Sequence, residues 1–139
     1  MTVRLKPILF LWGPVLAWAG VIYFFSSRPD LPHIDEPWLE LVLRKSAHVA
    51  EYAIFGVLLA RAVGMRKGQV AIAAALAALY AASDEWHQTF VPTRKGNPLD
   101  VALDSAAALL GAYAYARRFT ASAVVRHRPP QPDPRETEA

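Results

Sequence analysis

The chain has 139 residues, of which 54% are apolar and 19% charged, and its formal net charge is +3. This length is typical of a single domain. The absence of cysteine excludes a disulfide framework, a thiolate metal site and a cysteine nucleophile. The basic residues flank apolar segments and form no basic face, so their charge is explained by membrane anchoring and orientation rather than by nucleic-acid binding.

The first apolar run covers residues 7–25, contains no charge and follows Arg4 and Lys6. About 20 apolar residues are enough to span a bilayer core. A cleavable signal peptide is the alternative, because residues 17–19 resemble a cleavage site. The apolar run continues past that point, however, and the apolar part of a signal peptide is normally shorter. We therefore expect an uncleaved transmembrane helix here.

A polar connection follows, at about residues 26–44. Pro29, Pro32 and Pro37 discourage a long regular helix in this stretch. Residues 38–43 begin with a tryptophan, which prefers the headgroup level of a membrane. We expect these residues to form a short interfacial helix, separate from the membrane helix that follows.

Three further membrane helices are expected, at about residues 45–63, 69–90 and 99–119. Their apolar runs are long enough to span a bilayer. Residues 120–139 are charged and rich in proline, a composition that cannot bury a core and is typical of disorder. The expected fold is all-α: a polytopic membrane protein with a four-helix transmembrane domain at residues 1–119 and a disordered cytoplasmic tail.

Lysine and arginine set the expected orientation, because they are enriched on the cytoplasmic side of membrane proteins. With the N-terminus in the cytoplasm, that side receives Arg4, Lys6, Arg61, Arg66, Lys67, Arg117, Arg118, Arg126 and Arg128. The other side receives Arg28, Arg44, Lys45, Arg94 and Lys95. We expect a multi-pass protein of the inner (cytoplasmic) membrane with both termini in the cytoplasm, Arg66 inside and Asn97 outside.

Ionisable and polar residues gather at three helix ends that this topology brings to the outer side. They are Lys45, His48, Glu51 and Tyr52, then Asp84, Glu85, His87 and Gln88, and finally Asp100 and Asp104. An unpaired charge at membrane depth costs on the order of 2.5–3.5 kcal/mol. These groups must therefore pair, become neutral, bind a metal or line a wet cavity. Such a cluster within a membrane is by default a candidate functional site.

Helical spacing puts members of the cluster on shared faces. One face carries Lys45, His48 and Tyr52, a second carries Asp84 and Gln88, and a third carries Asp100, Asp104, Ala107 and Gly111. The small residues of the third face let a neighbouring helix approach closely. The cations expected to pair with the carboxylates are Lys45, His48 and Arg94.

Each residue taken singly has a simpler explanation. Lys45 alone is explained as an interfacial anchor, and Asp100 as a favourable charge at a helix N-terminus. Tyr52 and His87 are explained as residues of the interfacial belt. The functional interpretation therefore depends on the convergence of these groups rather than on any one of them.

Three ordered blocks resemble the VanZ-like membrane proteins. They are Lys45-Ser-Ala-His48-Val-Ala-Glu-Tyr52, then Asp84-Glu85-Trp-His-Gln88-Thr-Phe90-Val-Pro92-Thr-Arg94, then Asp100-Val-Ala-Leu-Asp104 with Gly111. Thr93 and Ala107 stand where that family commonly has glycine. The resemblance implies a protein of the cell envelope, and the namesake of the family lowers susceptibility to the glycopeptide teicoplanin.

Two functions and a structural alternative remain open. The protein is an enzyme acting on an envelope lipid or a peptidoglycan-related intermediate, or it binds or transports such a lipid without cleaving a bond. In the third case the charges only fix the packing of the helices as a membrane scaffold. The resemblance does not decide among them, because it implies no settled molecular activity.

Candidate roles follow from side-chain chemistry. The catalytic candidates are Lys45, His48, Asp84, Glu85 and Asp104, and the substrate-binding candidates are Tyr52, Gln88, Arg94 and Asp100. Lysine and arginine suit a phosphate or carboxylate, whereas a desolvated acid suits a general base and histidine an acid–base partner. The carboxylates also leave open a divalent cation such as Mg²⁺, which prefers oxygen ligands.

Overall fold

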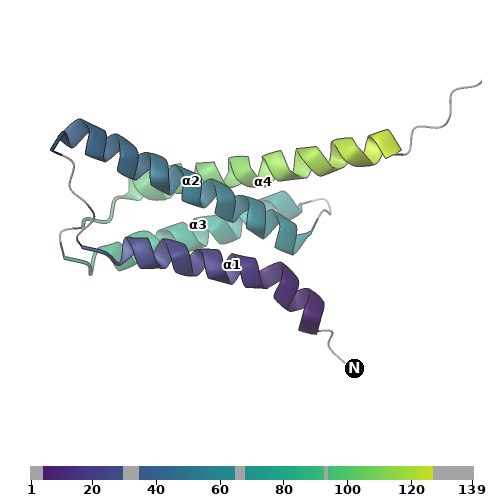
Figure 1. The fold of residues 1–139 in the computed structure, drawn as a ribbon, viewed down its shortest axis with the longest axis horizontal. Coiled ribbons are helices and arrows are strands. Elements are labelled where there is room, and N and C mark those ends of the chain that lie inside the picture. The colour runs from purple at the N-terminus through teal and green to yellow at the C-terminus, as the bar shows by residue number, and fades with distance from the viewer. Residues whose placement is uncertain (1–4, 30–34, 65–67, 93, 127–139) are drawn as a thin grey trace, which may run out of the picture.

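The structure is a computed structural model that describes residues 5–29, 35–64, 68–92 and 94–126. Within those ranges it contains α-helices and no strand, as the sequence predicts. The helices are α1 (Leu5–Ser26), α2 (Pro37–Val63), α3 (Gln69–Gln88) and α4 (Pro98–Arg126). Successive helices run in opposite directions along one bundle, so the ends of α1 and α3 lie beside the beginnings of α2 and α4 (Figure 1).

The outside of the bundle is apolar. Large apolar side chains are exposed on every helix, including Leu9 and Leu16 on α1, Leu41 on α2, Leu79 on α3 and Leu110 on α4. By length and composition, α1 over Pro7–Ser26 and the whole of α2 are able to cross a membrane. An exposed apolar surface spread over all four helices is suited to contact with lipid rather than water.

The beginning of α2 differs from the prediction. We expected a helix from residue 45 and a separate interfacial helix at 38–43, but α2 is continuous from Pro37. Proline is tolerated in the first turn of a helix, because the N–H that it lacks has no intrahelical partner there. Pro37 therefore starts this helix, and the polar groups expected at its end lie further along it.

Helix α1 changes direction towards its N-terminal end (Figure 1). Pro14 lies inside this helix, where it cannot donate a hydrogen bond to the carbonyl of Phe10. Both terminal nitrogens of Arg61, on α2, instead donate to that carbonyl oxygen at 3.4 Å. The Arg61 guanidinium also lies 4.6 Å from the centre of the Phe10 ring. An arginine from the neighbouring helix thus supplies the donor that the proline removes.

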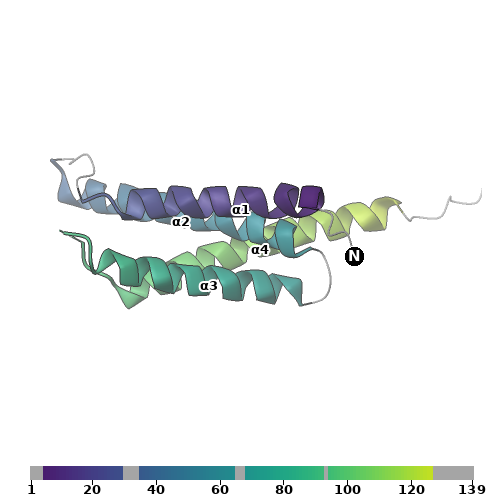
Figure 2. The same ribbon diagram turned by 90° about the horizontal axis from the view of Figure 1, so that it is seen from below.

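Small residues form much of the core. Ala73, Ala77 and Ala81 on α3 and Ala108 and Ala112 on α4 are fully buried. Because these side chains are short, neighbouring helices approach one another closely. Figure 2 shows α1 and α2 on one side of the bundle and α3 on the other, with α4 crossing from the side of α3 towards that of α1 and α2.

Glycines set the contact between α2 and α4. A Cβ on Gly56 would overlap the backbone oxygen of Ala108, and a Cβ on Gly111 would overlap that of Ala53. The expectation that the small-residue face of the fourth helix admits a close neighbour is therefore confirmed, and that neighbour is α2. Ala107, on the same face, is 5% exposed.

Helix α4 continues to Arg126, beyond the predicted end at residue 119. The rest of the predicted tail, residues 127–139, lies outside the described residues, as do Arg4, Pro32, Arg66, Lys67 and Thr93. The predicted ends of the first and third helices, residues 25 and 90, lie close to the observed ends at Ser26 and Gln88.

Candidate functional site

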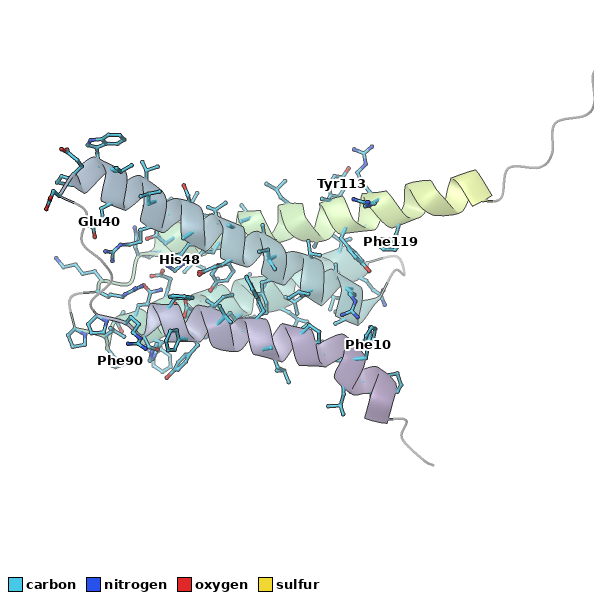
Figure 3. The ribbon with its side chains drawn as sticks, viewed as in Figure 1. Phe10, Glu40, His48, Phe90, Tyr113 and Phe119 are labelled. Carbon is cyan, nitrogen blue, oxygen red and sulfur yellow. The ribbon has the colours of Figure 1, made fainter. Side chains whose placement is uncertain are left out.

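The predicted site residues come together at one end of the bundle, where α1 and α3 end and α2 and α4 begin. They are Lys45, His48 and Tyr52 on α2, Asp84, Glu85 and Gln88 on α3, Asp100 and Asp104 on α4, and Arg94 in the connection between α3 and α4. In Figure 3, Glu40 and Phe90 mark this end and Phe119 lies towards the other. Residues far apart in the sequence are thus neighbours in the fold.

Asp84 is held from three helices. Only 4% of its surface is exposed. Its Oδ2 accepts hydrogen bonds from Ser26 Oγ at 2.8 Å, Gln88 Nε2 at 3.2 Å and Tyr52 Oη at 3.4 Å. Its Oδ1 has no hydrogen-bond partner among the described residues. One oxygen of this carboxylate therefore fixes its orientation, while the other is enclosed and unused.

Glu85 joins the end of α3 to the connection that follows. Its Oε2 accepts the backbone N–H of Asn97 at 2.8 Å, and its Oε1 accepts the Gln88 amide at 3.3 Å. A Cβ on Gly96 would lie 2.7 Å from the backbone oxygen of Glu85 and equally close to the Thr89 methyl group. The connection therefore packs tightly on α3, and only glycine fits at position 96 without displacing it.

Two cation–carboxylate contacts link α2 to α4. Lys45 Nζ forms an ion pair and hydrogen bond with Asp100 Oδ1. One helical turn further along both helices, His48 Nδ1 lies 3.7 Å from Asp104 Oδ2. Asp104 is 2% exposed, so its carboxylate faces the interior. The expectation that Lys45 and His48 neutralise carboxylates agrees with this geometry.

A cavity of about 180 Å³ opens among these groups. Its polar and charged lining consists of Arg44, Lys45, His48, Glu85, Gln88, Arg94, Lys95, Asp100 and Asp104. Leu41, Val49 and Leu103 supply an apolar part of the wall. Tyr52 and Asp84 are not in its lining and lie behind it, where they help to position Gln88. The cavity thus combines a charged interior with an apolar side.

Arg94 forms no ion pair with a carboxylate of the described residues, although the sequence suggested it as a partner for one. Its three N–H contacts in the described part of the chain go to the backbone oxygens of Phe25 at 3.0 Å and Arg28 at 3.2 Å, and to Gln88 Oε1 at 3.3 Å. The carbonyls at the end of α1 lack intrahelical donors and carry the negative end of the helix dipole. Desolvation, followed by repulsion from Arg44, lowers the pKa of the Arg94 guanidinium from its ordinary value.

The carboxylates do not form a ready metal site. No three histidine, aspartate or glutamate side chains of the described residues are placed to hold a metal ion. Glu85 and Asp100 already accept donors from Asn97 and Lys45. The divalent cation left open by the sequence therefore finds no fitting ligand set here.

Sequence reasoning missed Ser26, which it assigned to a polar connection. Ser26 is 1% exposed and donates to Asp84. Its position directly after the apolar run, at the depth of the other polar groups, is the available signal. His87 is set apart from the cluster: its ring lies 4.8 Å from that of Tyr23, and its Nε2 is 3.0 Å from Ser27 Oγ.

Comparison with known proteins supports the resemblance of the three sequence blocks. The family model described as VanZ/LLP1 matches residues 10–120. That match covers all of α2 and α3 and most of α1 and α4. No curated protein and no solved structure matches the chain. The extent of the family match nevertheless shows that this chain belongs to the VanZ/LLP1 family.

Proposed function

We propose that this protein is an integral membrane protein of the cell envelope whose charged cavity binds the anionic headgroup of an envelope lipid or of a lipid-linked peptidoglycan intermediate. The observation that carries the proposal is that two of the cations lining the cavity have no carboxylate partner among the described residues. Neither Arg94 nor Lys95 makes an ion pair with a described residue, whereas the carboxylates Glu85 and Asp100 already have donors. The positive charges of Arg94 and Lys95 are therefore available to bind an anion.

The chemistry of the anion follows from the same residues. Lys95 is exposed at the rim of the cavity, and Lys45 lies on α2 within it. Ammonium and guanidinium groups form strong, charge-assisted hydrogen bonds with phosphate and carboxylate oxygens. A phosphate on a long isoprenoid or acyl chain suits a cavity that also has Leu41, Val49 and Leu103 in its wall.

The proposed topology places this cavity in the outer half of the membrane. All four helices cross the bilayer, and both termini lie in the cytoplasm of a bacterial cell. Support comes from the excess of arginine and lysine in the sequence segments expected on the cytoplasmic side and from the apolar outer surface. Headgroups of the outer leaflet would then reach the cavity directly.

Acid–base catalysis is the second candidate function, and the geometry of His48 and Asp104 favours it. A carboxylate beside one ring nitrogen orients a histidine and leaves the other nitrogen for proton transfer. Here Asp104 Oδ2 lies 3.7 Å from Nδ1 of His48, which is within ion-pair distance but longer than a hydrogen bond, and both residues line the cavity. In this case Lys45 and Lys95 hold the anion while His48 moves a proton. Asp84, which the sequence suggested as a general base, serves to position Gln88.

A direct test uses the full-length protein in lipid nanodiscs with a polyprenyl monophosphate as the probe. We expect saturable binding of the phosphate and none of the matching uncharged polyprenol. Lys95→Gln should weaken binding roughly tenfold, the loss of one charge-assisted contact. Arg117→Gln removes a positive charge from the opposite half of α4 and should leave binding unchanged. Equal binding of phosphate and polyprenol would refute the proposal.

Catalysis is tested on the same preparation. If His48 moves a proton, His48→Gln should abolish release of inorganic phosphate or headgroup while binding of the polyprenyl phosphate persists. Binding without any turnover by the unaltered protein would leave the non-catalytic function. The link to glycopeptides, proposed on family membership, is tested by expressing the gene in a susceptible host and measuring teicoplanin susceptibility.

A further inference from the structure

A second cavity, of about 260 Å³, lies between α1 and α3 at the same end of the bundle. Its walls are largely aromatic: Tyr23, Tyr80, Trp86 and Phe90 line it, together with Ser83, Asp84 and His87. Trp86 and Phe90 are each 69% exposed and pack edge to face, with ring centres 5.6 Å apart. The cavity therefore opens on the outer surface, and Figure 3 shows Phe90 at this end of the bundle, beyond α3.

Among the described residues, Asp84 is the only carboxylate in the lining of this cavity. Its Oδ2 is engaged by Ser26, Tyr52 and Gln88, but its enclosed Oδ1 accepts no hydrogen bond from the described residues. An enclosed acceptor without a donor costs free energy, and more so when it belongs to a charged group. A residue in the lining of an aromatic cavity thus has an unused position for a hydrogen-bond donor, preferably a cation.

We propose that this cavity binds the primary ammonium headgroup of a membrane lipid, with Oδ1 of Asp84 accepting one of its N–H groups. The aromatic side chains of Tyr23, Tyr80 and Trp86 in the lining favour a cation in the same space. A quaternary ammonium would satisfy the rings but has no N–H to donate, so the unpartnered oxygen selects the primary amine.

The position of the cavity indicates a lipid rather than a free amine. Its mouth lies between α3 and α1, and α1 is apolar enough to span a membrane. The exposed rings of Trp86 and Phe90 at the mouth suit the boundary between headgroups and acyl chains. Oδ1 is covered, so a headgroup reaches it only if side chains of the cavity wall turn aside.

Native mass spectrometry of the full-length protein released from nanodiscs tests the proposal. The discs contain phosphatidylethanolamine, phosphatidylcholine and phosphatidylglycerol in equal amounts. We expect the primary amine lipid to be retained about tenfold over the quaternary one, as one hydrogen bond to a charged group predicts. Equal retention of ethanolamine and choline lipids, or preference for the anionic glycerol lipid, would overturn the assignment.

Two variants locate the bound lipid. Asp84→Asn should remove the preference, whereas Glu51→Gln, which neutralises a carboxylate outside both cavities, should keep it. Because Asp84→Asn also alters contacts to Ser26 and Tyr52, Ser83→Phe provides a second test. It fills the cavity from an exposed position and should abolish retention, whereas Ala82→Phe, on the adjacent exposed residue, should not. Unchanged retention in a folded Ser83→Phe variant would place the lipid elsewhere. Polyprenyl phosphate binding, measured in parallel, reports on the first cavity separately.

Discussion

The backbone oxygen of Ala53, on α2, occupies the space that a Cβ on Gly111, on α4, would need. These helices meet backbone to backbone at this point, and the pairs Lys45–Asp100 and His48–Asp104 lie along the same interface. We expect Gly111→Ala to destabilise the fold by about 1–3 kcal/mol, the usual cost of overpacking a tight contact. The free energy of unfolding in detergent or bilayer measures the effect.

Gly20→Ala is the matched control, because nothing lies within 4 Å of a Cβ at that position of α1. Alanine is the better helix former by roughly 0.5–1 kcal/mol, so this variant should be neutral or slightly stabilising. Equal free energies of unfolding for Gly111→Ala and Gly20→Ala would contradict the close approach of α2 and α4.

The contribution of Arg61 to the free energy of unfolding should depend on the proline in α1. Its hydrogen bonds to the Phe10 carbonyl replace the one that Pro14 cannot make. We expect Arg61→Met to cost about 0.5–1.5 kcal/mol, the net worth of one such interaction. In a Pro14→Ala background the carbonyl regains an intrahelical donor, so the cost should fall. A double-mutant cycle on unfolding free energies measures this coupling, and strict additivity would disprove it.

The hydrogen bonds to Asp84 should differ in strength. Ser26 donates at 2.8 Å and Tyr52 at 3.4 Å to the same oxygen. Polar contacts inside membranes contribute about 0.6 kcal/mol on average and up to about 1.7 kcal/mol. We expect Ser26→Ala to fall near the upper value and Tyr52→Phe near or below the average, as measured by unfolding in bicelles. A larger loss for Tyr52→Phe would mean that the tyrosine is the main support of the carboxylate.

Arg94→Lys should weaken the connection between the end of α1 and the segment after α3. The guanidinium reaches the oxygens of Phe25, Arg28 and Gln88 at once, which a single ammonium cannot do. We expect a loss of about 1.5–3 kcal/mol, as for a hydrogen bond to a charged group. Protease cleavage after residue 28 would report local opening. If lysine preserved full stability, a point charge alone would explain the role of Arg94.

Cysteine labelling tests the topology, and the chain is suitable because it has no native cysteine. An impermeant thiol reagent added to intact cells should label Asn97→Cys and spare Arg66→Cys until the membrane is opened. This follows from the excess of lysine and arginine in the sequence segments expected on the cytoplasmic side. Labelling of Arg66→Cys in intact cells would reverse the proposed orientation.

The sequence by itself determined the four long helices and which of their ends carry the polar groups. Helical hydrogen bonds are local, and the apolar runs with their breaks specify where such bonds form. It also determined which residues share a face, so that Lys45 and Asp100 were expected near one another and the small residues around Gly111 were expected to admit a neighbour. The predictions were wrong where a residue type is compatible with two local structures. Pro37, for example, begins a helix instead of interrupting one.

Only the tertiary structure decided which polar groups contact one another and which cavity each of them lines. It places Arg94 on carbonyls at the end of α1 rather than on a carboxylate, and it brings Ser26 to Asp84. It also directs Asp84 to a cavity separate from the one lined by Asp104. These relationships join residues distant in the sequence, and they depend on the rotation and separation of packed helices. That packing is set jointly by all the contacting side chains, so no local pattern contains it.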